Sequence, residues 1–260
     1  MPPHMKIAVA GATGRAGRHV VAVLRDQGHH VVPISRSQGV DVVTGSGLAA
    51  ALEGVESIVD VSTSPSPDQT AATEFWTASA RNLHEAGMRA GVQRLIVVSI
   101  IGTDRFTAGY GVAKVAHERA ALSGPIPARI LRAAQFHEFV AQLIEWGTQG
   151  DVAYVQRMRT QLVAARTVAE ALAELATDPS SVPEPQGQPI AEIAGPQAEN
   201  LVDMATLLVA KRGDGLRIEA VSDPSEPNRA VYEEGGLLPG PHARLAGPTF
   251  VEWLNSGTPN

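Results

Sequence analysis

The sequence predicts an α/β protein whose core is a parallel sheet covered by helices on both faces. Short apolar segments recur along the first half of the chain, and longer segments with helical periodicity separate them. Strands that alternate with helices in this way form right-handed βαβ units and pair in parallel. Of the 260 residues, 44% are hydrophobic, which is enough for a substantial core. The expected strands cover residues 6–12, 30–35, 57–62, 94–100 and 128–132.

The segments between these strands carry the signals of helices and of their ends. In residues 15–27, for example, Val20, Val23 and Leu24 recur on one helical face, and Gly28 follows the segment. Pro33 is awkward in a central strand and favours a strand end or a bulge. The expected helices of the first half cover residues 15–27, 48–52, 71–90 and 110–122.

The second half of the chain is less regular. Its apolar segments predict strands at residues 161–164, 190–194 and 216–221 and helices at residues 168–176 and 201–211, and a loop rich in Pro and Ser covers residues 178–188. We expect residues 151–260 to complete the sheet and to add a small lobe. Together with residues 5–150 they then form a single structural unit.

Composition argues against several classes of partner. The formal net charge is −6 and no run of Lys or Arg is present, so we expect no nucleic-acid partner. Cysteine is absent and the eight histidines are scattered, so we expect no metal site. No apolar run approaches the roughly 20 residues that span a bilayer. We therefore expect a cytoplasmic protein without membrane contact.

A glycine-rich turn joins the first strand to the first helix. Its sequence is Gly11-Ala-Thr-Gly14-Arg-Ala-Gly17. Gly11 permits the tight turn, Gly14 lets the backbone approach a pyrophosphate, and Gly17 lets the helix pack close to the strand. The helix N-terminus adds unpaired N–H groups and a positive dipole. We interpret the turn as a dinucleotide site rather than an ordinary glycine turn. The residues expected at the cofactor are Gly11, Thr13, Gly14, Arg15, Ala16 and Gly17.

The residues after the second strand indicate which cofactor is bound. NAD-selective sites place an acidic side chain there for the ribose 2′-hydroxyl. This chain has Ser35, Arg36 and Ser37 instead, and a guanidinium suits a 2′-phosphate. The alternative is that Arg36 is simply solvated. We expect NADP(H) to be preferred over NAD(H).

Polar residues near the ends of the third and fourth strands predict where chemistry occurs. Tyr110 and Lys114 lie four apart on one helical face, and a lysine ammonium beside a phenol lowers the tyrosine pKa. Such a phenol can exchange a proton with a substrate oxygen, to which Ser99 can also bond. Alternatively, Lys114 binds only the cofactor ribose and Tyr110 packs nearby. The cofactor is also expected to meet Ser62, Thr63 and Ser64.

Several segments resemble the atypical short-chain dehydrogenase/reductases and, within them, the NmrA-like NAD(P)H-binding proteins. They are GATGRAG, VVSIIGTDRF, GYGVAK and ARILRAAQFHEFV, and the match runs over residues 6–176. The resemblance implies a Rossmann-type, doubly wound parallel sheet with a small C-terminal substrate lobe. It also implies that Ser99, Tyr110 and Lys114 form the catalytic set. Two departures are a short Ser-to-Tyr interval and the lack of the family's Asn-Ala-Gly pattern.

The segment after the fifth strand is where such relatives approach the nicotinamide and the substrate. It holds Gln135, Phe136 and His137, and His137 is either a proton donor or a packed residue. The leading hypothesis is an NADPH-dependent reductase of a small carbonyl, quinone or similar electrophile. The alternative is a non-catalytic, NADP(H)-sensing regulator that binds a protein partner. A sugar-nucleotide epimerase ranks last, because the C-terminal region is small for a lobe that holds a nucleotide sugar. Either a monomer or a homodimer is consistent with the sequence.

Overall fold

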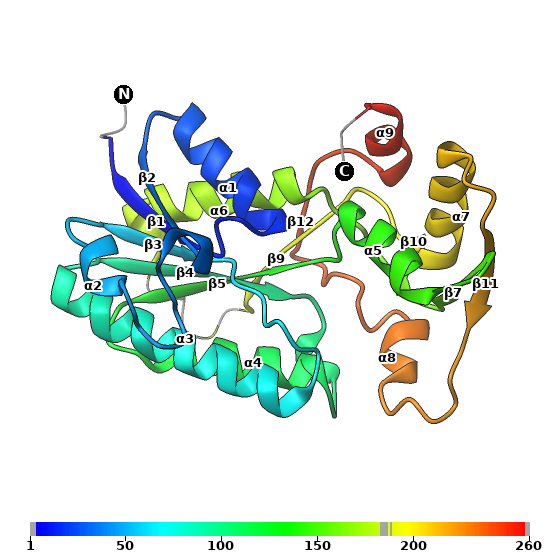
Figure 1. The fold of residues 1–260 in the computed structure, drawn as a ribbon, viewed down its shortest axis with the longest axis horizontal. Helices are drawn as coiled ribbons and strands as arrows, with labels where there is room; N and C mark the ends of the chain where they lie inside the picture. The colour runs from blue at the N-terminus through cyan, green and yellow to red at the C-terminus, as the bar shows by residue number, and fades with distance from the viewer. Residues whose placement is uncertain (1–3, 183–186, 188, 258–260) are drawn as a thin grey trace. The chain divides into compact units, whose positions relative to one another are not determined.

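A computed structural model describes residues 4–182, 187 and 189–257. Its centre is a seven-stranded sheet in the order β12-β9-β5-β4-β3-β1-β2 (Figure 1). β1 pairs in parallel with both β2 and β3, and β3 pairs in parallel with β4. The predicted fold class is therefore confirmed. The strands are β1 (Lys6–Ala10), β2 (His30–Ile34), β3 (Ser57–Asp60), β4 (Arg94–Ile100), β5 (Ala128–Ala133), β9 (Ala191–Ala194) and β12 (Arg244–Leu245).

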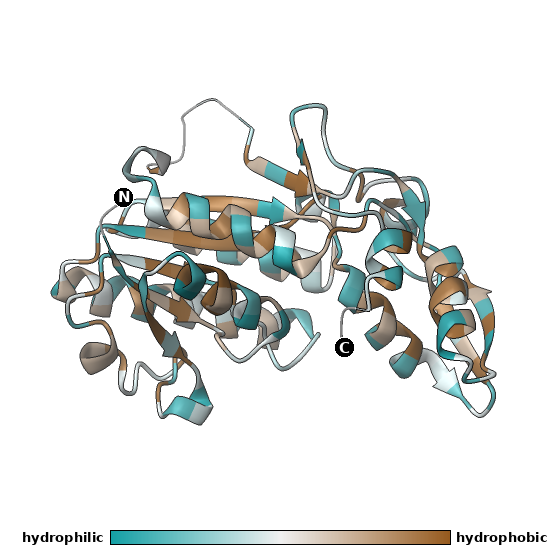
Figure 2. Cartoon of the chain, turned by 90° about the horizontal axis from the view of Figure 1, so that it is seen from above, coloured by the Kyte–Doolittle hydropathy of each residue, from teal (hydrophilic) through white to brown (hydrophobic). Residues whose placement is uncertain are grey.

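Helices lie on both sides of this sheet, with α1 and α6 on one side and α3 and α4 on the other (Figure 1). Figure 2 shows mainly hydrophobic strands between helices of mixed character, as expected for a sheet buried on both faces. α3 begins at an N-cap, Asp68, whose side chain accepts a hydrogen bond from the Ala71 N–H. The helices are α1 (Arg15–Asp26), α2 (Leu48–Ala51), α3 (Gln69–Ala90), α4 (Tyr110–Ser123) and α6 (Ala165–Thr177).

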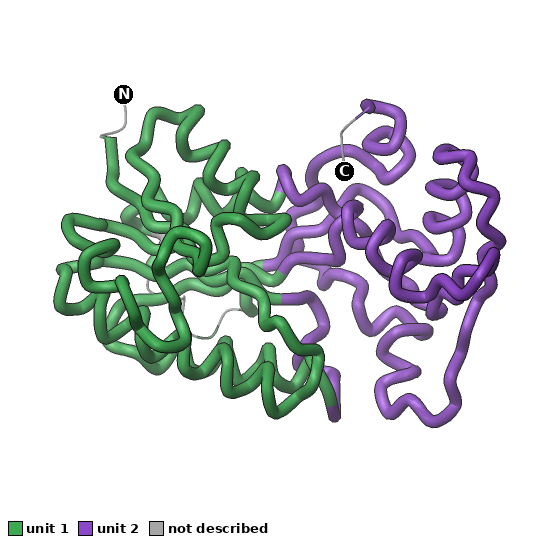
Figure 3. The backbone as a smooth tube through the Cα atoms, in the orientation of Figure 1, with its two compact units in different colours: residues 1–99, 109–132, 168–191 green, residues 100–108, 133–167, 192–260 purple. Residues whose placement is uncertain are grey.

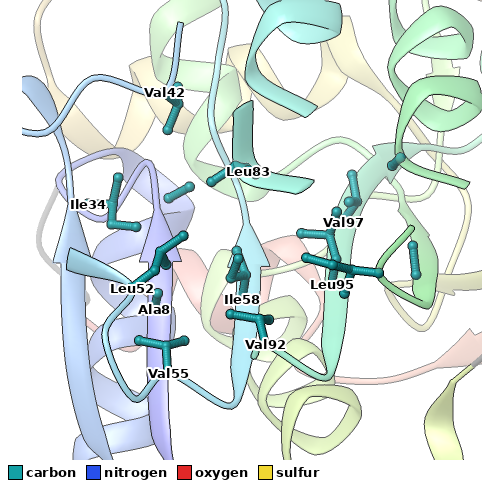
Figure 4. Close-up of a cluster of buried hydrophobic side chains, with 14 of the residues drawn as sticks. Ala8, Ile34, Val42, Leu52, Val55, Ile58, Leu83, Val92, Leu95 and Val97 are labelled. Atoms are coloured by element: carbon teal, nitrogen blue, oxygen red, sulfur yellow. The ribbon is translucent and has the colours of Figure 1, made fainter. Parts of the chain in front are cut away.

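A cluster of buried side chains fills the space between the sheet and its helices (Figure 4). Ala8 and Ile58 contribute from the strands, and Leu83 contributes from α3. Because these side chains are completely buried, their removal from water is the main force that holds the strands together. Pro33 is tolerated inside β2, where it pairs with Val9, because β2 is the edge strand of the sheet.

The chain divides into two compact units (Figure 3). Unit 1 comprises the described parts of residues 1–99, 109–132 and 168–191, and unit 2 comprises those of residues 100–108, 133–167 and 192–260. The chain thus passes between the units several times. Unit 1 contains the glycine-rich turn and every expected catalytic residue.

Unit 2 has its own apolar core, which packs around Val140, Ile144, Leu162, Leu201 and Phe250. A three-stranded sheet in the order β11-β7-β6 and the antiparallel pair β10-β8 belong to this unit. Its strands are β6 (Thr148–Gln149), β7 (Val152–Gln156), β8 (Arg159–Thr160), β10 (Glu199–Asn200) and β11 (Arg217–Val221). Its helices are α5 (His137–Gly147), α7 (Leu201–Arg212), α8 (Arg229–Glu233) and α9 (Phe250–Asn255).

Two expectations for the second half need correction. Residues 161–164 do not form a strand, because only Val163 makes a bridge, to Phe136, and Gln161 instead accepts a backbone hydrogen bond from Gly195. The strand expected at residues 216–221 exists as β11, but it pairs with β7 outside the central sheet. The loop at residues 178–188 lies partly outside the described residues, and its described part includes a 3₁₀ turn, Pro179–Ser181. None of the described helices is both long and apolar enough to cross a membrane.

Candidate functional site

The glycine-rich turn lies between β1 and α1 and is packed too tightly for larger residues. Gly11 has a φ of +79°, and a Cβ there would lie 2.8 Å from the Cα of Ser62 and from the carbonyl oxygen of Val61. A Cβ on Gly17 would lie 2.0 Å from the Gly11 carbonyl oxygen. Gly14 has an ordinary φ of −74° and donates its N–H to Gly11 at 2.9 Å. The turn therefore has no room for a side chain at position 11 or 17.

The N-terminus of α1 has the features of an anion site. Its N-cap is Gly14, no side chain caps the helix, and no acidic residue lies in its first turn. The first amides and the positive end of the helix dipole are thus left without a side-chain acceptor. Thr13 and Arg15 are exposed beside these amides, whereas the side chain of Ala16 is buried. A pyrophosphate would meet the backbone N–H groups here together with the exposed side chains.

Two buried hydroxyls near the ends of β3 and β4 lack partners. Among the described residues, the Oγ atoms of Ser62 and Ser99 make no hydrogen bond. A buried hydroxyl without a partner costs about 1–3 kcal/mol, so this arrangement favours a ligand with polar groups. The backbone of Ser62 packs directly against Gly11, which brings one of these hydroxyls to the glycine-rich turn. A dinucleotide cofactor fits both features.

The remaining residues of the third-strand loop differ in exposure. Thr63 is exposed and available to a ligand. Ser64 is buried, and its hydroxyl donates to the Ser66 carbonyl at 2.9 Å and accepts from the Ser66 N–H at 3.2 Å. Ser64 therefore shapes its own loop, and its side chain is already engaged.

The segment after β2 lies next to the glycine-rich turn, because the Gly11 N–H donates to the Ile34 carbonyl at 3.0 Å. Arg36 opens a single 3₁₀ turn, Arg36–Gln38, and is exposed. The hydroxyls of Ser35 and Ser37 lie 2.9 Å apart and form a hydrogen bond. The three side chains thus form a small polar group with one positive charge beside the turn.

Lys114 lies at the centre of a buried polar network within unit 1. Its Nζ donates to the Val98 carbonyl at 2.8 Å and lies 3.1 Å from Nδ1 of His117. Nε2 of His117 lies 3.2 Å from a carboxylate oxygen of Asp60. The ammonium also lies 4.5 Å above the centre of the Trp76 ring. Burial lowers the pKa of Lys114 to about 8.

Tyr110 is partly buried at the start of α4 and packs edge-on against Trp76. Burial raises the pKa of Tyr110 to about 12. The expectation that Lys114 lowers this pKa is wrong, because desolvation of the phenol dominates and the ammonium is directed toward Val98 and His117. The phenol is therefore fully protonated at neutral pH.

The three residues expected near the substrate belong to unit 2. Gln135 accepts a hydrogen bond from the Thr160 hydroxyl, and Phe136 is the N-cap residue of α5. His137 is completely buried, and its Nε2 donates to the Pro248 carbonyl at 3.1 Å. Burial lowers the pKa of His137 to about 4. Its ring is therefore neutral and packed, and contact of any of the three with substrate stays a prediction.

Trp76, His117 and Asp60 are not among the residues that we expected at the site from the sequence. Two signals were present. His117 follows Lys114 by three residues, which places it on the same helical face, and Asp60 ends an otherwise apolar strand segment. The described residues contain no group of three or more His, Cys, Asp or Glu side chains arranged to hold a metal ion.

Comparison with known proteins agrees with this geometry. The model of a family described as NAD(P)H-binding matches residues 11–179, which include the turn, the Ser35–Ser37 group and the Lys114 network. No curated protein sequence is similar enough to count as a match.

Solved structures share the fold at low sequence identity. A short-chain dehydrogenase/reductase superfamily protein from Agrobacterium tumefaciens with bound NAD is 19% identical, with a TM-score of 0.67 over 96% of this chain and 95% of that one. An NADPH-dependent quinone oxidoreductase from Escherichia coli is 18% identical, with a TM-score of 0.64 over 96% and 98% of the two chains.

A nucleoside-diphosphate-sugar epimerase from Staphylococcus aureus is 14% identical, with a TM-score of 0.63 over 96% of both chains. Since that epimerase is aligned over almost all of both chains, the small C-terminal region does not distinguish this chain from such enzymes. The size argument against an epimerase is therefore wrong.

Proposed function

This chain belongs to the NAD(P)H-binding family, and we propose on that premise that it is an NADPH-dependent oxidoreductase. Its substrate is a small carbonyl, quinone or similar electrophile, which is reduced by hydride transfer. The observation that carries the proposal is the cofactor cradle: a turn with no room for side chains at Gly11 and Gly17, an uncapped helix N-terminus, and the unpartnered Ser62 hydroxyl beside them. Each of these features occurs elsewhere in the chain, and it is their combination at the end of β1 that supports a dinucleotide site.

The preference for NADPH is supported by the charge at the end of β2. Arg36 is exposed there, and the neighbouring Ser35 and Ser37 side chains are neutral hydroxyls. A guanidinium binds a phosphate through two charge-assisted hydrogen bonds, whereas a ribose 2′-hydroxyl prefers the acidic residue that is missing here. The side chains that meet the adenosine end of the cofactor therefore favour NADPH over NADH.

Residues of this chain supply the proton and orient the substrate and the cofactor. When bound, the nicotinamide supplies the hydride. Tyr110, which is protonated at neutral pH, donates the proton to the substrate oxygen, and the Ser99 hydroxyl bonds the same oxygen. A protonated phenol is the form that can supply the proton needed for reduction. Lys114 holds the cofactor ribose and does not act as the proton donor.

Titration with the nicotinamide nucleotides followed by a substrate panel tests this proposal. We expect saturable binding of NADPH, weaker binding of NADH, and oxidation of NADPH by at least one carbonyl or quinone. A nucleoside-diphosphate sugar belongs in the panel as the test of an epimerase. Absence of binding to either nucleotide would overturn the proposal.

A second candidate function is a non-catalytic NADP(H) sensor, and one observation favours it. The Lys114 ammonium is directed to Val98 and His117 rather than tuning the phenol of Tyr110. A protein that only binds the cofactor does not need a tyrosine with a lowered pKa. Tight NADPH binding together with no oxidation by any substrate, and capture of a protein partner by only one redox form, would support the sensor.

A further inference from the structure

We propose that Asp60 and His117 are positioning residues that hold the Lys114 ammonium as a hydrogen-bond donor to the ribose of the bound cofactor. The inference rests on the proposed function, because it takes Lys114 as a cofactor ligand. It adds two residues, from β3 and α4, that the sequence analysis and the family resemblance do not assign.

The direction of the hydrogen bonds follows from the chemistry of the groups. A lysine ammonium can only donate, so Nδ1 of His117 accepts from it at 3.1 Å. The proton of the neutral imidazole then sits on Nε2, which donates to Asp60 at 3.2 Å. The other oxygen of Asp60 accepts from the Ser62 N–H at 2.9 Å. The chain of bonds fixes the orientation of the lysine side chain.

Trp76 holds the same network from α3. Its ring stacks on His117 with an angle of 6° and a centroid distance of 5.4 Å, and it lies below the Lys114 ammonium. Its Nε1 donates to the Ser62 carbonyl at 3.3 Å. Both arms of the network therefore end on the backbone of Ser62, the residue that packs against Gly11. This shared residue links the lysine mechanically to the glycine-rich turn.

The surrounding charges explain why a carboxylate is needed. Lys114 is 4% exposed, and Asp60 and His117 are 1% exposed at their side chains, so the ammonium is almost completely desolvated. Glu118 lies on the same helix and is paired with Arg132 from β5 through hydrogen bonds of 2.9 and 2.8 Å. Asp60 and Glu118 both favour the charged form of Lys114, and Asp60 contributes more. Desolvation and the neighbouring Lys114 charge lower the pKa of His117, which keeps the ring neutral.

Replacing Asp60 with asparagine tests the inference, because an amide oxygen can still accept from the Ser62 N–H. The chain contains only three lysines, Lys6, Lys114 and Lys211, so lysine labelled with ¹³C at Cε gives three NMR signals, and Lys114→Met identifies the relevant one. In the apo wild type we expect Lys114 to titrate near pH 8. In Asp60→Asn we expect a lower midpoint, because the carboxylate that favours the charged form is gone.

Cofactor binding gives the second readout. The dissociation constants of NADPH for the wild type and for Asp60→Asn are compared at about pH 6.5 and about pH 8.5. At each pH the ratio of the two constants is independent of any ionisation of NADPH itself. We expect roughly tenfold weaker NADPH binding by the variant at the higher pH, because a charge-assisted hydrogen bond is lost, and a smaller difference at the lower pH. A purely structural role would weaken binding equally at both pH values and leave the lysine midpoint unchanged, which would overturn the inference.

His84 provides the matched control. It is another buried histidine, on α3, whose Nε2 donates to the Ala121 carbonyl and whose Nδ1 accepts from the Ile126 N–H, so that neither ring nitrogen bonds Lys114. His84→Gln is expected to leave the lysine midpoint and the pH dependence of binding as in the wild type. If His84→Gln shifts them as Asp60→Asn does, the inference is wrong. Failure of the wild type to bind any nucleotide refutes the proposed function, whereas the lysine titration in the apo protein still tests the network.

If Asp60→Asn does not fold, as measured by circular dichroism, substitutions at His117 replace it. Phenylalanine keeps the stack on Trp76 but removes both hydrogen bonds, and we expect roughly tenfold weaker NADPH binding. Glutamine keeps one acceptor and one donor and is expected to recover most of the affinity. Equal affinity of His117→Phe and the wild type would contradict the inference.

Discussion

The ring of Tyr110 packs edge-on against the ring of Trp76, with the ring centroids 5.0 Å apart and the planes at 70°. Burial of the phenol raises the pKa of Tyr110 to about 12, and the contact with Trp76 is part of that burial. The phenol is therefore a proton donor at every physiological pH and is not available as a base. In the proposed reaction the phenol therefore acts as the acid that protonates the substrate oxygen.

Tyr110→Phe removes the proposed proton donor while keeping the aromatic contact with Trp76. We expect kcat to fall by about 10²- to 10⁴-fold, the usual contribution of general acid catalysis, with an unchanged Kd for NADPH. Tyr154→Phe, at an exposed position of unit 2, is the control and should behave as the wild type. Unchanged kcat in Tyr110→Phe across the substrate panel would remove Tyr110 from the mechanism.

Gly11→Ala tests whether the glycine-rich turn binds the cofactor, and Gly91→Ala is its control. Both glycines have a φ of +79°, so both substitutions carry the same backbone strain, about 1 kcal/mol. Only at Gly11 would the new methyl group meet other atoms, at 2.8 Å from the backbone at Val61 and Ser62. We expect NADPH binding to be lost in Gly11→Ala and retained in Gly91→Ala, as measured by calorimetry. Equal affinities would show that the turn does not hold the cofactor.

Arg36→Ala should change cofactor preference more than overall affinity. We expect roughly tenfold weaker binding of NADPH and little change for NADH, because only the 2′-phosphate contact is lost. Arg25→Ala is the matched control, because Arg25 is exposed in the last turn of α1, at the end of that helix away from the glycine-rich turn. A parallel loss for both nucleotides in Arg36→Ala would mean that Arg36 does not read the 2′-phosphate.

The stability of the protein should depend on His137 below neutral pH. The imidazole has an ordinary pKa of 6.5, and burial lowers it to about 4 in the folded protein. The unfolded chain therefore binds a proton first as the pH falls, so stability that is present above about pH 6.5 is lost as the pH falls through about 4. The shift corresponds to at most about 3 kcal/mol.

Denaturant unfolding of the wild type and His137→Phe between about pH 7 and about pH 4 measures this contribution. Other buried histidines shift in the same direction, so the comparison of the two slopes isolates His137. The variant should lose less stability than the wild type over this range. Identical slopes would show that His137 is not held neutral by burial.

The sequence predicted the first half of the fold well, for a physical reason. Strands such as β4 are mainly apolar segments that are buried in the sheet, and segments with helical periodicity separate them along the chain. Unit 2 was harder to predict because its strands are short and pair with distant segments. β11, for example, is half-exposed and pairs with β7, 65 residues earlier in the chain. One readable signal was overlooked, the capping box of Thr249 and Glu252 at the start of α9.

The candidate site was predictable where a backbone pattern defines it and less so where tertiary packing does. The spacing of Gly11, Gly14 and Gly17 between a strand and a helix identified the cradle. The Tyr110–Lys114 spacing correctly placed both residues on α4, but it could not show that Trp76 from α3 desolvates them. The direction of the tyrosine pKa shift depends on that burial, and it is therefore a property of the folded protein alone.

Isothermal titration of the purified protein with NADPH and, separately, with NADH tests the central claim most directly. The account predicts saturable binding of both nucleotides at one site per chain, with NADPH bound more tightly. No measurable affinity for either nucleotide would contradict it.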